Sequence, residues 1–160
     1  MRNLTPNLWF DTQAEEAAHF YVSIFDNSKI GIVTRYSDIG AQASGMPAGS
    51  VMTISFELEG KPFVAINGGP VFKFTEAVSF QIDCATQEEI DMFTEKLIAD
   101  SGSQQPCGWI EDKYGLSWQV VPEGMDELAQ DPVKFERAMG AMMQMEKIDM
   151  AVLKQAYEGN

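Results

Sequence analysis

The sequence predicts an α+β protein in which a βαβββ unit occurs twice and is followed by a C-terminal helical extension. The first observation is that the order of alternating and helical segments repeats along the chain. The second is that the two predicted helices of the repeat begin alike. Thr12-Gln13-Ala14-Glu15-Glu16 followed by Phe20 resembles Ala85-Thr86-Gln87-Glu88-Glu89 followed by Phe93. The Glu-Glu pair and the later Phe coincide, which favours two copies of one unit.

The first unit is predicted to begin with an alternating strand at residues 4–10. Asp11 and Thr12 offer N-cap chemistry for a helix that extends to about Phe25, with Glu15 and Glu16 in its first turn. Strands are predicted at 30–36, 51–58 and 61–67, the last two joined by a Glu59-Gly60 hairpin turn. Residues 37–50 are rich in Gly, Ala and Ser, which predicts a long, mobile connection between strands.

The second unit follows the same order. A strand is predicted at 77–84, a helix from Thr86 to about residue 101, two short strands near 104–108 and 109–112, and a last strand at 116–121. The predicted organisation is one domain at 1–124, with modules at about 1–72 and 73–124, and a helical extension at 125–160.

The extension is predicted to contain helices that begin at Asp131-Pro132 and at Ile148-Asp149. Five methionines lie within residues 139–150. A Met stripe at helical spacing is typical of ordinary core or of a dimer interface. The alternative is a pliable binding surface.

Composition argues against several classes of protein. A formal net charge of −13 with scattered basic residues is unlike a nucleic-acid binder, which needs clustered Lys and Arg. Apolar runs fall short of a membrane span, and no apolar signal segment opens the chain. We expect a cytoplasmic protein that binds neither nucleic acid nor membrane.

Strong catalytic motifs are absent from the sequence, and no catalytic residue is predicted. The chain has no glycine-rich nucleotide loop and no G-x-S-x-G. The only histidine, His19, lies on a predicted helix, and the two cysteines, Cys84 and Cys107, have no activating neighbour. Any metal would need carboxylate, amide or water ligands, which suit Mg²⁺ or Mn²⁺ better than Zn²⁺.

Polar residues on otherwise apolar strands are the candidate ligand-binding groups. If these strand faces line one concavity, amides, hydroxyls and an indole would suit a neutral polar or aromatic small molecule. The alternative is that these side chains bond one another or water within a half-open sheet. The predicted ligand-binding residues are Asn7, Trp9, Asn67, Ser79, Gln81 and Gln119.

Several ordered motifs carry a family resemblance. They are Leu8-Trp9-Phe10-Asp11, Ala14-Glu15-Glu16-Ala17, Phe20-Tyr21, Asn67-Gly68-Gly69-Pro70, Cys107-Gly108-Trp109 and the run from Asp112 to Gln119. Together they resemble the PhnB-like branch of the vicinal-oxygen-chelate (glyoxalase/bleomycin-resistance) superfamily. Proteins of this branch are often labelled 3-demethylubiquinone-9 3-methyltransferase.

The resemblance implies curled mixed sheets around a cleft, in a homodimer. Metal-dependent members of the superfamily place ligands on the first and last strands of the modules. Their Asp-x-x-Gly pattern with a Glu four residues after the Gly maps onto Asp112, Gly115 and Gln119, so an amide replaces the carboxylate. Asn7 stands on the first strand where a His or Gln would be expected. We therefore predict no metal ligand and no cofactor, with Mg²⁺ or Mn²⁺ as the alternative.

Three functions remain open from the sequence. The first is a metal-free small-molecule-binding protein, and the second is a divalent-metal-dependent isomerase, lyase or dioxygenase-like enzyme of the same fold. The third is a partner protein that docks through its Met-rich tail. A methyltransferase is disfavoured, because we find no glycine-rich loop for S-adenosylmethionine.

Overall fold

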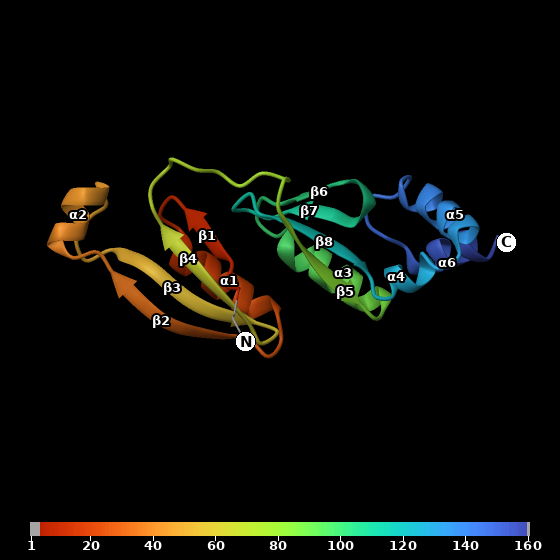
Figure 1. The fold of residues 1–160 in the computed structure, drawn as a ribbon, viewed down its shortest axis with the longest axis horizontal. Coiled ribbons are helices and arrows are strands. Elements are labelled where there is room, and N and C mark those ends of the chain that lie inside the picture. The colour runs from red at the N-terminus through yellow and green to blue at the C-terminus, as the bar shows by residue number, and fades with distance from the viewer. Residues whose placement is uncertain (1–3, 160) are drawn as a thin grey trace. The chain divides into compact units, whose positions relative to one another are not determined.

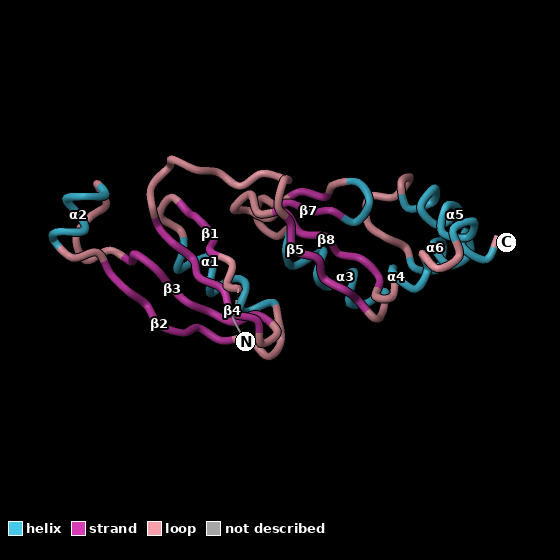
Figure 2. The backbone as a smooth tube through the Cα atoms, viewed as in Figure 1, coloured by secondary structure: helices cyan, strands magenta, loops and turns pink. Residues whose placement is uncertain are grey.

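The structure is a computed structural model that describes residues 4–159. The chain divides into two compact units, Met1–Lys73 and Phe74–Asn160. Each unit contains one four-stranded mixed sheet, and the fold is α+β (Figures 1 and 2). The two sheets share one topology, which confirms that the βαβββ unit occurs twice.

The first unit follows the predicted order with one addition. Its sheet has the strand order β1-β4-β3-β2, in which β1 is parallel to β4 and the other neighbours are antiparallel. Its elements are β1 (Asn7–Phe10), α1 (Ala14–Ile24), β2 (Lys29–Arg35), α2 (Asp38–Ser44), β3 (Val51–Leu58) and β4 (Lys61–Asn67).

The second unit closes its sheet in the same way and then continues into helices. The strand order is β5-β8-β7-β6, with β5 parallel to β8. Its elements are β5 (Ser79–Cys84), α3 (Gln87–Leu97), β6 (Ser103–Gln104), the 3₁₀ helix η1 (Pro106–Gly108), β7 (Trp109–Glu111), β8 (Ser117–Pro122), α4 (Met125–Leu128), α5 (Pro132–Met142) and α6 (Met150–Glu158).

The core of the first unit lies between its sheet and α1, which contacts all four strands. Tyr21 of α1 is fully buried and stacks on Phe56, whose ring stacks in turn on Phe63. Ala14, Ala17 and Ala18 are also fully buried, and their small side chains let the helix approach the strands closely. Helix α1 therefore covers one face of this sheet and leaves the other face uncovered by a helix of the first unit.

The core of the second unit lies between α3 and its sheet. Helix α3 contacts β5, β7 and β8, and its buried residues are Ile90, Thr94 and Leu97. Thr86 caps this helix, since its side chain accepts a hydrogen bond from the N–H of Glu89 at 3.2 Å. The carboxylate of Glu89 accepts in return from the N–H of Ala85 at 2.7 Å.

A strap at residues 145–150 ties the helical extension to the second unit. Ile148 is fully buried, and the Gln87 side chain bonds both the Ile148 carbonyl and the Met150 N–H, at 3.0 and 2.9 Å. Lys147 forms an ion pair with Asp91 at 2.6 Å. The predicted helix starts are confirmed, because Asp131 and Asp149 are the N-caps of α5 and α6.

Four local predictions were wrong. Neither Asp11 nor Thr12 is the N-cap of α1, which is Gln13 without a side-chain cap, because the Asn67 amide oxygen accepts from the Ala14 N–H instead. Residues 37–50 contain α2, which Ser37 caps through the N–H of Gly40. The predicted strand at 104–108 is a two-residue strand followed by a 3₁₀ helix, because the Cys107 and Gly108 N–H groups bond the Met145 and Glu146 carbonyls of the strap. Over residues 4–159 the sheets are open, with two edge strands each, and are not curled as the resemblance implied, since four strands are too few to close.

No helix within residues 4–159 is long and apolar enough to cross a membrane.

Candidate functional site

The predicted residues of the first strand lie on the face of the sheet away from α1. Leu8 and Phe10 are buried toward the helix, so the alternating neighbours Asn7 and Trp9 point the other way. The Trp9 indole N–H donates to the Gly69 carbonyl at 2.9 Å, and its ring meets Phe72 edge-on at 5.0 Å. Asn7 is exposed and donates to the Thr5 carbonyl at 3.0 Å.

Asn67 lies on the opposite face from Asn7 and Trp9. It is 4% exposed, and its amide oxygen accepts from the Ala14 N–H at 2.8 Å. Its amide nitrogen donates to the Val51 carbonyl at 3.1 Å. The structure thus brings Asn7 and Trp9 onto one face and places Asn67 at the start of α1.

The predicted residues of the second unit are brought together. Ser79 and Gln81 lie on β5 and Gln119 on β8, and the register pairs Gln81 with Gln119 directly. The Gln119 amide donates to the Ser79 hydroxyl at 2.8 Å. Gln81 donates to the Asp83 carboxylate at 2.6 Å. All three side chains share the face of the sheet away from the buried Trp118 and Val120.

Two further residues extend this face and were missed in the sequence. Trp109 pairs with Gln119, and Glu111 pairs with Ser117, across the β7–β8 ladder. Opposed side chains on neighbouring strands lie about 4.5–5.5 Å apart at Cβ, so these groups adjoin the predicted ones. The buried Ser117 of β8, which pairs with both Ser79 and Glu111, completes the set. We call this set the polar face, and its residues are Ser79, Gln81, Trp109, Glu111, Ser117 and Gln119. The Trp109-Ile110-Glu111 alternation was the available signal, but three residues are too few to assign a face without the register.

Asp112, which the resemblance aligned with a family motif, organises the loop before β8. Its carboxylate is 1% exposed and accepts from the N–H groups of Tyr114 and Leu116, at 2.8 and 3.1 Å. Its second oxygen accepts from the Trp118 indole N–H at 2.9 Å. The carboxylate therefore fixes the turn and the Trp118 ring.

The cysteines and the histidine lie apart from the polar face. Cys84 is fully buried, and burial followed by the nearby carboxylates of Glu89 and Asp83 raises its thiol pKa to about 12. Cys107 is partly exposed in a left-handed backbone conformation with φ +61°. His19 lies exposed on α1.

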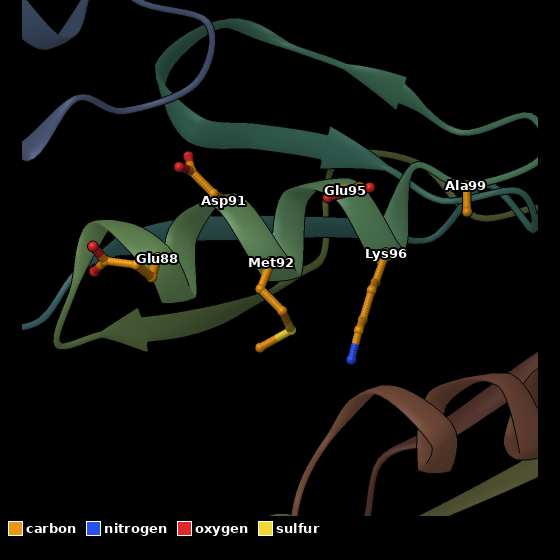
Figure 3. Close-up of a pocket in the computed structure, with 6 residues that line it drawn as sticks. All are labelled: Glu88, Asp91, Met92, Glu95, Lys96 and Ala99. Carbon is orange, nitrogen blue, oxygen red and sulfur yellow. The ribbon is translucent and has the colours of Figure 1, made fainter.

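Hollows on the surface do not coincide with the polar face. One of about 520 Å³ lies along α3, where Met92 and Lys96 project together in Figure 3. A second, of about 550 Å³, is lined by α3, Gln104 and the strap residues Glu146 and Lys147. A third, of about 180 Å³, lies on the first sheet around Gly31, Ser55 and Val64.

Among residues 4–159, the side chains around Asp112 and Gln119 do not fit a divalent cation. Hard cations prefer several carboxylate oxygens, and within residues 4–159 no group of three or more His, Cys, Asp or Glu side chains lies close enough to hold a metal. The motif carboxylate, Asp112, already accepts three hydrogen bonds. The Gln119 amide supplies no charge and is bonded to Ser79.

The fold and this geometry define a protein of two βαβββ units, each with polar side chains on one open sheet face. A family model described as 3-demethylubiquinone-9 3-methyltransferase matches residues 2–121, so the chain belongs to this family. The PhnB protein of Bacillus cereus, which carries the same description, is 36% identical, and the match covers 75% of this chain and 99% of that protein, with a TM-score of 0.66.

Two more distant structures share the fold. A Pseudomonas aeruginosa protein is 17% identical over 76% of this chain and 98% of its own, with a TM-score of 0.60. The fosfomycin resistance protein FosX of Listeria monocytogenes, in complex with Mn(II) and sulfate, is 15% identical over 81% of this chain and 98% of its own, with a TM-score of 0.53. Comparison with curated proteins found no match.

Proposed function

We propose that the protein binds a small molecule without a metal, on a fold of the glyoxalase/bleomycin-resistance kind, and that the polar face is its binding surface. One observation carries this proposal. Ser79 and Gln119 form a half-buried, hydrogen-bonded pair at 2.8 Å on an open sheet face, beside the ring of Trp109. A positioned polar pair beside an aromatic ring suits recognition of a small molecule.

Asn7 and Trp9 are the residues of the first unit that we assign to ligand binding. Both lie on the open face of its sheet, and the Trp9 ring is fixed by Gly69 and Phe72. Asn67 supports ligand binding only indirectly, by holding the start of α1 in place. Its amide is not free to contact a ligand, because it is hydrogen-bonded to Ala14 and Val51. We also propose a cytoplasmic homodimer, on the resemblance alone.

Thermal-shift screening of the full chain against metabolites and antibiotics tests the proposal. A ligand should raise the melting temperature of the wild type, because a molecule that binds only the folded state stabilises that state. Gln119→Leu should abolish that shift, whereas Gln130→Ala, at an exposed position before α5, should retain it. If no compound shifts the wild type, or if Gln119→Leu responds like the wild type, the proposal fails.

The alternative is a divalent-metal-dependent enzyme, which the Mn(II) complex of FosX favours by fold alone. The occupied Asp112 carboxylate and the neutral Gln119 argue against it here. Elemental analysis after incubation with Mn²⁺ or Mg²⁺ distinguishes the two functions. The alternative requires stoichiometric metal in the wild type and loss of that metal in both Asp112→Asn and Gln119→Leu. The family's description also names methyl transfer, which we disfavour, and calorimetry with S-adenosylmethionine tests it directly.

A further inference from the structure

Most of the protein's negative charge lies in its second unit. Residues 74–160 contain 17 acidic and six basic residues, a net charge of −11. Residues 1–73 contain seven acidic and five basic residues, a net charge of −2. A surface whose charge is of one sign concentrates solutes of the opposite sign around it. The polar face therefore lies in the unit that attracts cations.

The polar face also presents an aromatic ring and a carboxylate without partners. Trp109 and Glu111 are two residues apart on β7, so their side chains emerge on the same side, and both are partly exposed. Within residues 74–159 neither the Trp109 indole N–H nor the Glu111 carboxylate makes a hydrogen bond or an ion pair. A free carboxylate beside a tryptophan ring is the pair of groups that an ammonium ion prefers.

Positive charge is missing from this face. None of its six residues is Lys or Arg, and the nearest lysine in sequence, Lys113, is ion-paired with Asp100 at 2.9 Å. Asp83, which follows Gln81 on the same side of β5, adds a second carboxylate. An anionic ligand would meet these carboxylates with no compensating cation.

We propose that the polar face binds an organic cation, with the ammonium group over the Trp109 ring and against the Glu111 carboxylate. The Ser79–Gln119 pair then hydrogen-bonds the polar part of the same molecule. This inference rests on the proposed function and adds to it the charge of the ligand.

Calorimetry on the full chain with three probes that share a phenyl ring tests the charge. Benzyltrimethylammonium is the cation, phenylphosphonate the anion and benzyl alcohol the neutral molecule. We expect the cation alone to bind, more weakly as salt is raised. Glu111→Gln and Trp109→Leu should each weaken binding about tenfold or more. Glu136→Gln, which removes the same charge from an exposed site on α5, should change it less than twofold.

Circular dichroism on each variant establishes that it is folded, and Glu111→Gln preserves the shape of the side chain. If phenylphosphonate or benzyl alcohol binds, and Gln119→Leu abolishes that binding, the cation assignment is wrong while the binding surface stands. Equal effects of Glu111→Gln and Glu136→Gln would mean that the net charge of the protein alone attracts the cation. That result would overturn the assignment of the binding site to the polar face. If none of the three binds, the cation assignment falls, and the metabolite screen decides the proposed function separately.

Discussion

The side-chain oxygen of Asn67, on β4, accepts a hydrogen bond at 2.8 Å from the N–H of Ala14, the first residue of α1. The residue that precedes this helix, Gln13, makes no side-chain cap. Asn67 therefore performs from 53 residues away what an N-cap side chain normally performs locally. The same amide donates to the Val51 carbonyl, and the Asn67 carbonyl accepts from the Tyr36 hydroxyl at 2.6 Å.

Asn67→Ala should lower the free energy of unfolding by about 2–4 kcal/mol, because it leaves a buried N–H and a buried carbonyl without partners. Urea denaturation measures the change. Asn7→Ala is the matched control, since Asn7 is exposed and bonds only the nearby Thr5 carbonyl, and should change stability by less than about 0.5 kcal/mol. Equal effects of the two substitutions would contradict the capping role.

Gly68→Ala should displace the Trp9 indole. A Cβ at Gly68 would overlap Cζ2 of that ring, so the ring must move and lose its bond to Gly69. We expect a loss of about 1–3 kcal/mol and a shift in tryptophan emission. Gly140→Ala is the control, because nothing lies within 4 Å of its Cβ in α5, and it should stabilise the protein by about 0.5–1 kcal/mol.

Asp112→Asn should destabilise the second unit by about 1–3 kcal/mol. An amide keeps one acceptor oxygen, but its NH₂ group then faces an N–H donor that now bonds the carboxylate. Denaturation followed by tryptophan fluorescence reports both stability and the Trp118 environment. Asp126→Asn, an exposed acid in α4, should behave as the wild type. An unaltered midpoint in Asp112→Asn would contradict the structural role of this carboxylate.

Acid should release the strap. The hydrogen bonds from Lys147 and then from Gln87 lower the pKa of Asp91 below its ordinary value of 3.8. A carboxylate with a depressed folded-state pKa stabilises the protein above pH 3.8 and loses this contribution as pH falls through the lowered value. Melting temperatures from pH 7 to pH 2 should therefore fall more steeply for the wild type than for Lys147→Ala. Lys154→Ala, an exposed lysine in α6, should follow the wild type.

The two thiols should differ in reactivity. With a pKa of about 12, Cys84 is thiolate at only about one part in ten thousand at pH 8, and it is fully buried as well. Cys107 is partly exposed. Mass spectrometry after iodoacetamide treatment should show label at Cys107 alone in the folded protein and at both residues in urea. Label on Cys84 in the folded protein would contradict its burial.

Patterns that are local in sequence predicted local structure well. Val51–Leu58 and Lys61–Asn67 form strands with the predicted bounds, because alternation and the Glu59-Gly60 turn are both local signals. The N-caps Thr86, Asp131 and Asp149 were predicted for the same reason. The repeated strand order likewise followed from a pattern visible along the chain.

Features that depend on distant partners could not be predicted. Asn67 was predicted as a ligand-binding residue because it is a polar residue on an otherwise apolar strand, whereas in the fold its amide is bonded to Ala14 and Val51. Trp109 and Glu111 join the polar face only through their register with β8. The 3₁₀ helix at Pro106–Gly108 forms where the strap arrives from nearly 40 residues later, as the bond from Cys107 to Met145 shows.

The pairing of first strand with last strand has a consequence for synthesis on the ribosome. Neither β1 nor β5 has its parallel neighbour until β4 or β8 has emerged, so each sheet must close a long loop before its first strand is paired. Every strand pair within residues 4–159 lies on one side of Lys73. We therefore expect the N-terminal sheet to be fully paired while the second half of the chain is still being translated, which shortens the time that its unpaired strand edges are available for aggregation.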